Sequence, residues 1–353
     1  MIDLKRLDYP QLAGFVADGG HKPYRARQLA AWVFQRGACS FDDMSDLPAP
    51  YRGQLSQTAK ITCLRLLASQ ESTDGTVKFL FGLEDGAAVE SVLISDENRR
   101  TLCVSSQVGC KLGCGFCLTG TGGFIRSLGV EEIVDQVIRA RALAPEGRVT
   151  NLVLMGMGEP MDNLDNVIPA LKIITDPEYK LVGARKITVS TAGLAPGIER
   201  LGREFPKVKL AVSVNAGSDR VREAIMPVNR KYPMEQLARS LARYPLPTGR
   251  RITLEYVLIG GLNDTKEEAG GLGRFAKRFP SKINLIPYNP VPGALYQKPS
   301  VQSVDQFQKW LFGMGIPAFI RESKGADIMA ACGQLRGGLE GAGGASVDRF
   351  ADG

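Results

Sequence analysis

An alternation of strand-like and helix-like segments from about residue 100 onward constrains the fold of this chain most strongly. Short runs of β-forming residues predict strands at 100–106, 151–156, 186–190, 207–213, 251–258, 282–287 and 317–321. Amphipathic patterns between them predict helices at 130–144, 163–174, 195–204, 233–244, 265–278 and 302–314. Successive βα units of this kind predict a parallel sheet covered by helices, built as a closed barrel or an open fraction of one.

The rest of the chain divides into three shorter regions. Residues 1–75 show the apolar spacing of helices, one of which Gly37 ends. Residues 76–99 contain β-rich runs separated by turn-forming residues. We therefore expect a small N-terminal helical domain, a β extension, and a catalytic core over 100–335 that forms a partial (βα)6 barrel of the α/β class. The glycine-rich tail at 336–353 is expected to be disordered.

The charge pattern favours a polyanionic partner. The 353 residues carry a formal net charge of +7, and the stretch from Arg220 to Arg251 holds eight basic side chains against two acidic ones. A second, acid-free group near the N-terminus comprises Lys22, Arg25, Arg27 and Arg36. Solvated helix faces are the plain alternative for either group. No apolar run reaches membrane-spanning length and no signal sequence begins the chain, so we expect a cytoplasmic protein without membrane contact.

Histidine and cysteine usage narrow the chemistry further. His21 is the single histidine of the chain. A Ser-His-Asp or Cys-His nucleophile system, or a histidine-rich metal site, is therefore excluded from the core. In a cytoplasmic protein the seven cysteines are expected to be reduced, metal-bound or catalytic rather than a disulfide framework.

A glycine-rich loop with three cysteines follows the first predicted core strand. Cys110, Cys114 and Cys117 have the spacing C-x3-C-x2-C, which lets three thiolates converge while the glycines allow the backbone to wrap closely. A structural zinc or iron–sulfur site takes four protein ligands, whereas three thiolates on a four-iron cluster leave one iron open. A structural zinc site with Cys103 as fourth ligand is the alternative.

This loop, with Phe116 before its last cysteine, resembles the radical S-adenosylmethionine (SAM) superfamily. The resemblance implies that Cys110, Cys114 and Cys117 hold a [4Fe-4S] cluster whose free iron binds SAM. It also implies that one-electron reduction cleaves SAM to a 5′-deoxyadenosyl radical.

Further strings make the resemblance more specific over residues 20–335. The segments LCVSSQVGC, VLMGMGEPMDN, ITVSTAG, NLIPYNPVPGA and ADIMAACGQL are similar to the bacterial adenine C2-methyltransferases of 23S rRNA and tRNA. The resemblance implies cofactor contacts at Gly158, Glu159, Ser190, Ser213, Val214, Asn215 and Asn289. At Asn215 the chain departs from relatives that often have Ser-Leu-His over 213–215. These positions and the cysteine loop fall at the carboxyl ends of predicted parallel strands, where barrel enzymes build their sites.

Two cysteines outside the loop complete the expected site. The resemblance implies that Cys332 takes a methyl group from one SAM, and that the radical from a second SAM removes hydrogen from it. The resulting group adds to carbon 2 of adenine, Glu90 removes the proton there, and Cys103 attacks Cys332 to release the product and leave a disulfide. We expect Cys39 and Cys63 to be inert buried thiols.

The resemblance also implies the partners. It specifies 23S rRNA and tRNA as substrates and a flavodoxin or ferredoxin as electron donor, and we expect a monomer. The loop Pro227–Lys231 is expected to contact RNA phosphates, with the N-terminal helical region as a second platform. Three alternatives remain: a C8-methylating relative of the resistance type, a radical activase for another enzyme, and a non-catalytic RNA-binding protein with a structural metal.

Overall fold

A single open sheet forms the centre of the protein, whose computed structural model describes residues 1–144, 147–291, 293 and 295–337. The sheet has ten strands in the order β14-β13-β12-β11-β10-β9-β6-β5-β4-β3. Its parallel part consists of β6 (Arg99–Cys103), β9 (Asn151–Leu154), β10 (Ile187–Thr191), β11 (Lys209–Ser213), β12 (Ile252–Leu258), β13 (Ser281–Pro287) and β14 (Ala318–Ile320). Strands β14 and β3 are edges, so the expected parallel core is confirmed as an open fraction of a barrel.

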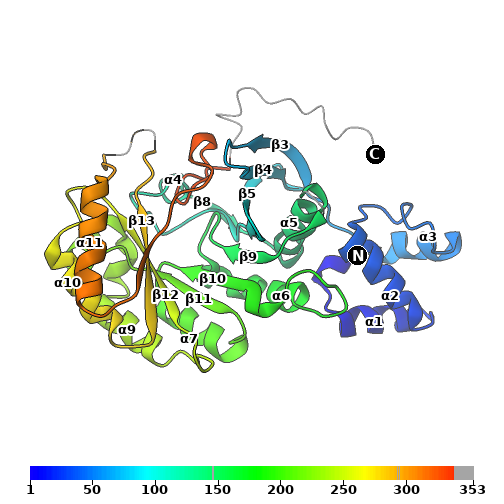
Figure 1. Ribbon diagram of the computed structural model, residues 1–353. Coiled ribbons are helices and arrows are strands. Elements are labelled where there is room, and N and C mark those ends of the chain that lie inside the picture. Colours follow the sequence, from blue (N-terminus) through cyan, green and yellow to red (C-terminus); the bar gives the residue numbers. More distant parts are fainter. Residues whose placement is uncertain (145–146, 292, 294, 338–353) are drawn as a thin grey trace.

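Helices cover the outer face of this parallel sheet (Figure 1). The six predicted helices appear as α5 (Val130–Leu143), α6 (Leu164–Ile174), α7 (Ala195–Glu204), α9 (Met234–Ala242), α10 (Lys266–Ala276) and α11 (Val301–Gly313). Helix α5 shows why they form, since Ile133, Val134 and Val137 bury one face while Glu132 caps the backbone N–H of Gly129 at 2.8 Å. No helix of the described residues has the length and apolar character needed to cross a membrane.

The two faces of the parallel strands differ in burial. In β9, Leu152 and Leu154 are at most 1% exposed beneath the helices, whereas Asn151 and Val153 on the inner face are half-buried. Strand β10 repeats this alternation. Parallel strands are usually buried on both faces. The inner face is therefore partly exposed at β9 and β10, whereas Ala211, Glu255 and Asn284 are buried on it at β11, β12 and β13.

An antiparallel extension continues the sheet beyond β6. It consists of β5 (Ala88–Asp96), β4 (Val77–Gly82) and β3 (Arg65–Glu71). Residues 65–71 are a strand although the sequence pattern placed them in the helical region. Their identity as a strand comes from pairing with β4, because the local sequence lacks a clear two-residue alternation.

The N-terminal region is mainly helical, as predicted, with α1 (Tyr9–Asp18), α2 (Tyr24–Ala30), a π-helical turn η2 (Ala31–Arg36) and α3 (Ala49–Thr58). A short parallel pair, β1 (Ile2–Asp3) with β2 (Ala59–Lys60), joins its two ends. A buried ion pair attaches it to α5, with 2.5 Å between Nζ of Lys5 and Oδ1 of Asp135. Burial lowers the pKa of Lys5, so the lysine depends on that carboxylate for its charge.

Cys39 and Cys63 form a disulfide with Cα atoms 5.5 Å apart, so the prediction of two inert thiols is wrong. Cys39 lies in the loop after η2, and Cys63 lies in the segment between β2 and β3. The backbone carbonyl of neighbouring Thr62 accepts from Nζ of Lys5 at 2.7 Å. This anchoring places the second cysteine beside the first, a long-range contact that neither local sequence encodes.

A C-terminal strap, which we define as residues 321–337, crosses from β14 to the turn between β3 and β4 (Figure 1). Its contacts there include Gly325 N to Oδ2 of Asp74 at 2.9 Å and Oγ of Ser72 to Oδ1 of Asp327 at 2.6 Å. The strap thereby connects the two edges of the open sheet. Residues 336 and 337 belong to the expected disordered tail but are placed, and 338–353 lie outside the described residues.

Candidate active site at the carboxyl edge of the sheet

The three-cysteine loop lies between β7 (Gln107–Gly109) and the short helix α4 (Leu118–Thr121). β7 pairs with β8 (Phe124–Ser127) in a separate two-stranded hairpin. Gly109 has a φ of +76°, and a Cβ there would stand 2.0 Å from the carbonyl oxygen of Gly123. Only glycine fits this close crossing of two backbones, which makes the loop fold back on itself.

The thiols of this loop are close enough to affect one another electrostatically. Burial raises the pKa of Cys110 to about 11, and it raises the pKa values of Cys114 and Cys117 as well. The neighbouring thiols add to the shift at Cys110 and Cys114. Three thiols in a region of low polarity are stable as thiolates only beside a strong positive charge.

This donor set fits an iron–sulfur cluster better than a single metal ion. Within the described part of the chain, no three cysteine, histidine or carboxylate side chains converge tightly enough to hold one ion. In a [4Fe-4S] cluster each cysteine binds a different iron, so three thiolates need to face one volume without sharing a metal. Cys110, Cys114 and Cys117 are the residues that would hold it.

An apolar cluster shields Cys114, the buried cysteine of the loop, from water. Cys114 packs among Ala192, Ile225, Met226, Val228, Ile259 and Tyr288, all at most 9% exposed. The backbone N–H of Gly115 donates to the carbonyl of Ile225 at 3.0 Å, which fixes the loop to this cluster. A dry environment of this kind strengthens every electrostatic contact made inside it.

Gly158 and Glu159 follow β9 and lie against the backbone that leads into the cysteine loop. Gly158 has a φ of +95°, and a Cβ there would stand 2.4 Å from Cβ of Gln107. The side-chain oxygen of that glutamine accepts from the Glu159 N–H at 2.9 Å. The pair is therefore built so that the Glu159 carboxyl faces the loop, and its charge acts on Cys110 and Cys114.

The Glu159 carboxyl is buried but supported by backbone donors. It accepts from the N–H of Met161 at 3.0 Å and of Ala192 at 2.8 Å. Burial raises its pKa to about 7, and these hydrogen bonds hold it from rising further. A buried carboxyl with this pKa is suited to a positively charged ligand group.

The other predicted cofactor positions line the inner face or its carboxyl edge. Ser190 and Ser213 are half-buried on β10 and at the end of β11. Val214 is fully buried, and its N–H donates to the carbonyl of Glu255. Asn289 follows β13 and is 8% exposed beside the strap, where Nε2 of Gln334 donates to the carbonyl of Pro290.

Asn215, one of the expected cofactor positions, is engaged with the protein itself. It has a φ of +57° and is 1% exposed. Its Oδ1 accepts from the Val257 N–H at 2.8 Å, and its Nδ2 lies 3.2 Å from the sulfur of Met226. The side-chain amide thus holds two strand ends together, and asparagine tolerates the left-handed backbone that this position requires.

Cys103 and Cys332 come together although 229 positions separate them in the sequence. Cys103 is buried at the end of β6, where burial and the nearby Cys332 raise its pKa to about 12. Cys332 lies on the strap and keeps an exposed surface, and burial of its thiol with the charges of Glu255 and Cys117 raises its pKa to about 11. Both thiols are free. The strap is held here by Leu118 N donating to the carbonyl of Gly333 at 2.8 Å.

Glu90 contacts the end of the same strap. It is 5% exposed on β5, and its Oε2 accepts from the N–H of Arg336 at 2.7 Å and of Gly337 at 3.2 Å. Its Oε1 lies 3.4 Å from Nζ of Lys78. Cys332 therefore belongs to the strap, and Glu90 accepts hydrogen bonds from its end. Movement of the strap would change the surroundings of both residues.

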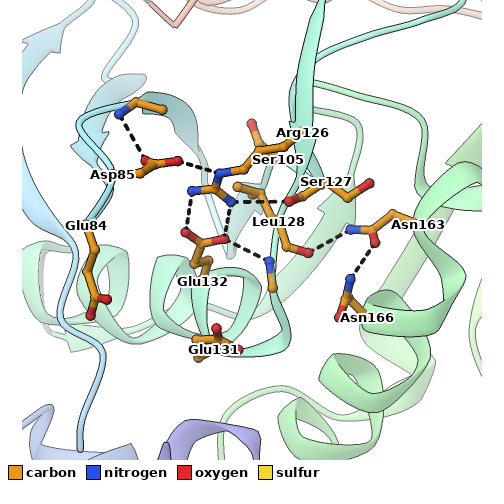
Figure 2. Close-up of polar contacts among 12 residues, drawn as sticks. Glu84, Asp85, Ser105, Arg126, Ser127, Leu128, Glu131, Glu132, Asn163 and Asn166 are labelled. Carbon is orange, nitrogen blue, oxygen red and sulfur yellow. Dashed lines mark hydrogen bonds and ion pairs between the residues drawn. The ribbon is translucent and has the colours of Figure 1, made fainter.

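Figure 2 shows how the β extension is fixed to strand β8, which pairs with the strand that leads into the cysteine loop. Arg126 on β8 donates Nε to Oδ2 of Asp85 at 2.6 Å and both terminal nitrogens to Glu132 at 2.8 Å. These partners raise the pKa of Arg126, Glu132 contributing most. Asp85 lies in the turn that begins the Glu90 strand, and β8 pairs with the strand before Cys110, so Arg126 sets their relative position.

A second contact in Figure 2 fixes the hairpin to the segment after Glu159. Nδ2 of Asn163 donates to the carbonyls of Ser106 and Leu128 at 2.8 and 2.9 Å. Nδ2 of Asn166 in turn donates to Oδ1 of Asn163 at 2.7 Å. The cysteine loop is therefore supported from the Glu90 side and from the Glu159 side.

Glu255 and Asn284 are buried polar residues of the inner face that the sequence analysis did not identify. They are cross-strand partners, and Nδ2 of Asn284 donates to Oε1 of Glu255 at 3.0 Å. Burial raises the pKa of Glu255 to about 7, while Oδ1 of Asn284 is buried with no hydrogen-bond donor among the described residues. When Glu255 is protonated, its hydroxyl is a donor of the kind that this oxygen lacks. The detectable signal was a glutamate inside an otherwise apolar strand, ITLEYVL.

The charge count of segment 220–251 suggested a uniformly exposed basic surface, but not all of its basic side chains are exposed. Arg222 is fully buried, and its guanidinium donates to the carbonyls of Ala192 and Val214 and to Oδ1 of Asn229. Burial lowers its pKa to about 10. Arg230 is exposed but pairs with Glu223 at 2.9 Å. The loop that contains it does reach the cysteine loop, since a Cβ at Gly113 would lie 3.9 Å from Cγ of Pro227.

Comparison with known families agrees with this architecture. A model of the ribosomal RNA large subunit methyltransferase N-terminal domain matches residues 2–61, and a model of the radical SAM superfamily matches residues 104–270. A solved radical SAM methyltransferase from Sphaerobacter thermophilus superposes with a TM-score of 0.91 and 43% identity, covering 96% of this chain and 100% of that one. The open parallel sheet with its three-cysteine loop therefore defines a radical SAM protein.

Curated relatives resolve the family. A dual-specificity RNA methyltransferase RlmN from Pelobacter propionicus is 48% identical over 96% of this chain and 97% of its own length. The RlmN of Geobacter sulfurreducens is 50% identical over 96% and 93%. The chain belongs to the RlmN family of dual-specificity RNA methyltransferases.

Proposed function

We propose that this chain methylates carbon 2 of adenine in 23S rRNA and tRNA through an S-methylated Cys332, with two molecules of SAM used per turnover. The observation that carries the proposal is the convergence of Cys103 and Cys332 next to the three-cysteine loop. Membership of the RlmN family supports it. A radical activase has no use for such a second thiol pair, and a non-catalytic RNA-binding protein has no use for either.

The chemistry of the acceptor requires this kind of site. Carbon 2 of adenine is an electron-poor amidine carbon and cannot attack the methyl group of SAM in a polar transfer. A [4Fe-4S] cluster held by Cys110, Cys114 and Cys117 would supply the electron that cleaves SAM to a 5′-deoxyadenosyl radical.

The cofactor positions have distinct roles in this proposal. Glu159 binds the positively charged methionyl amine of SAM, because its buried carboxyl gains from a cation that restores its ionised form. Ser190, Ser213, Val214 and Asn289 form the remaining wall along the inner face and its edge. Asn215 acts through the backbone that it holds, since both ends of its side-chain amide are occupied within the protein.

The thiols and Glu90 handle the methyl group and the proton. The Cys332 sulfur attacks the methyl carbon of the first SAM and takes the methyl group, which leaves S-adenosylhomocysteine. After the 5′-deoxyadenosyl radical removes a hydrogen atom, the sulfur-bound methylene carbon bonds to carbon 2. That adduct gives up one electron, which the oxidised cluster would accept, and Glu90 takes the proton from carbon 2. Cys103 then attacks the Cys332 sulfur, which breaks the sulfur–methylene bond and forms a Cys103–Cys332 disulfide that a thiol reductant must reopen, and the released methylene carbon gains a proton to become the methyl group.

Substitution of Cys103 tests the scheme. The Cys103→Ala variant forms the protein–RNA adduct but cannot resolve it, so anaerobic incubation with SAM, reductant and RNA should leave covalently bound nucleotide on denaturing gels. The double variant Cys103→Ala/Cys332→Ala is the matched control and should carry none. Absence of adduct in the single variant, from a preparation whose wild type methylates RNA, would contradict the scheme.

Further parts of the proposal concern organisation and partners. We assign residues 1–75 to an accessory RNA-contacting domain, 76–99 to the extension that carries Glu90, and 100–335 to the catalytic core. A flavodoxin or ferredoxin supplies electrons, and the enzyme works as a cytoplasmic monomer. Mass spectrometry of digested product RNA separates C2 from C8 methylation.

A further inference from the structure

The amino edge of the parallel sheet, opposite the cysteine loop, carries a group of basic side chains. They stand at or just before the starts of β6, β10, β11, β12 and β13. We call them the cation row: Arg99, Lys186, Lys209, Arg250 and Lys282. Adjacent strands are about 4.8 Å apart, so positive charges recur along this edge at short intervals.

Strand register fixes the direction in which the central cations project. Lys209 is the cross-strand partner of Thr188, and Lys282 is the partner of Thr253. Paired residues of neighbouring parallel strands project from the same face, and so do residues two positions apart. Because Ser213 is four residues after Lys209, Lys209 and Lys282 share the inner face with the predicted cofactor positions of β10 and β11.

Little negative charge balances the row. Arg99 pairs with Asp96 at 2.8 Å, but the other four members make no ion pair within the described residues. Partial burial, followed by repulsion from Lys282, Arg250, Lys186 and Arg99, lowers the pKa of Lys209. A concentration of like charge opposes folding and gains from a bound polyanion.

The inner face connects the row to the thiols. Lys209 and Ser213 are the ends of β11, a separation of about 13 Å at 3.3 Å per residue. On the neighbouring strands this face carries the small, partly exposed residues Thr188, Ser190 and Thr253, and Ala211 between the two ends of β11 is buried. Deeper on this face lies Glu255. The charge of Lys282 affects the pKa of Glu255, and the charge of Glu255 in turn raises the pKa of Cys332.

We propose that the cation row binds backbone phosphates of the substrate RNA, so that the target adenosine reaches Cys332 along the inner face from the amino edge of the sheet. This inference rests on the proposed function. A base that is modified at carbon 2 must leave its stack and extend away from its backbone, and a row of cations one strand length from the thiols suits that reach.

The position of the cation row favours RNA over an acidic electron-donor protein as its ligand. Electrons are needed at the cysteine loop, which lies at the opposite edge of the sheet. Phosphates, in contrast, repeat along a chain, and the basic residues at the neighbouring starts of β10, β11, β12 and β13 match such a repeat without reading sequence.

Charge reversal at the two exposed lysines of the row tests the proposal. The variant Lys186→Glu/Lys209→Glu is compared with Lys172→Glu/Lys309→Glu, an equal change on the outer helices α6 and α11 at exposed lysines that make no ion pair with any residue the structure describes. The probe is a fluorescent RNA stem–loop with an unpaired adenosine in its loop, and anisotropy gives Kd across a salt series. We expect the row variant to bind roughly tenfold or more weakly, with a salt slope reduced by about 1.4 to 1.8, and the control to match wild type.

The outcomes separate this inference from the proposed function. Equal melting temperatures establish that both variants fold. If wild type methylates RNA and the row variant binds like the control, the inference is overturned while the function stands. If methylation by the row variant fails with reduced flavodoxin but is normal with dithionite, the row docks the electron donor and the inference is also overturned. If wild type neither binds nor methylates RNA, the proposed function itself is wrong.

Discussion

The two edges of the same parallel sheet have opposite physical character. At the carboxyl edge Cys103 and Glu159 are buried in the protein, and burial raises the pKa values of both; it also raises the pKa of Cys332, whose residue keeps an exposed surface. At the amino edge Lys186 and Lys209 are exposed and unpaired within the described residues. Chemistry is favoured where water is excluded, because a buried thiol or carboxyl there becomes charged only when a positively charged ligand stabilises the charge. Reversible attachment of a polyanion is favoured where charges remain hydrated.

The difference shows how one set of strands serves two tasks. Alternation along each strand sends one residue set beneath the helices and the other to the inner face. Distance along the strand then decides whether an inner-face residue meets solvent or the cysteine loop. Effects of substitution should therefore be mainly on stability and chemistry at one edge and on RNA affinity at the other.

The largest effect is expected from removing the buried arginine of the carboxyl edge. Arg222→Ala leaves the carbonyl of Ala192, at 2.5 Å from the guanidinium, and Oδ1 of Asn229 without their donor and opens a cavity. We expect the free energy of unfolding to fall by about 3 kcal/mol. Chemical denaturation under anaerobic conditions measures it. Arg220→Ala, two positions away and exposed, is the control and should change it by less than about 0.5 kcal/mol. A small change in the free energy of unfolding of Arg222→Ala would show that buried polar contacts do not distinguish the carboxyl edge from the amino edge.

An intermediate, pH-dependent effect is expected at Glu255. Its pKa is raised to about 7, so the folded state holds the proton more tightly than the unfolded chain, and stability from this group is lost as pH rises through 7. Glu255→Gln cannot ionise, and its amide can donate to Oδ1 of Asn284. Relative to wild type, it should be more stable by about 1–3 kcal/mol at pH 8.5 and nearly equal at pH 5.

Thermal unfolding at several pH values checks this prediction. The exposed Glu97→Gln serves as control, with an expected difference from wild type that does not vary over the same range. A Glu255→Gln curve parallel to the wild-type curve would mean that the inner face is wetter at this depth than its burial indicates.

The smallest effect is expected at the loop beside the cysteines. Arg230 already pairs with Glu223, and Nζ of Lys231 lies 5.4 Å from the ring centre of Tyr232. Arg230→Glu/Lys231→Glu should weaken binding of the RNA stem–loop by a few-fold, on the order of 1 kcal/mol, less than reversal in the cation row. Unchanged affinity would remove this loop from the RNA surface. A loss larger than that of the row variant would reverse the comparison of the two edges.

Sequence patterns predicted the parts of this molecule that local periodicity encodes. The core strands and helices follow from alternation and amphipathic spacing, and the cysteine loop from its own spacing. The position of Cys332 beside Cys103 came instead from family resemblance, because no local pattern indicates that the strap connects the two edges of the sheet.

What could not be predicted depends on tertiary context. Arg222 has the same local appearance as exposed Arg220, and only the folded carboxyl edge shows that it is a buried donor. The Cys39–Cys63 disulfide joins segments that are separate in sequence, Thr62 beside it is held by Lys5, and β3 is defined by its pairing with β4. Glu255 was visible as a glutamate in an apolar strand, but its asparagine partner lies on the next strand.

Iron content and SAM cleavage, measured in one anaerobic preparation, test whether the three-cysteine loop holds a [4Fe-4S] cluster that cleaves SAM. We expect about four irons per chain, and we expect the reduced protein to convert SAM to 5′-deoxyadenosine. Substituting Cys114 by alanine should abolish both. Protein that holds zinc in place of iron, or that binds iron yet leaves SAM intact after reduction, would contradict this expectation.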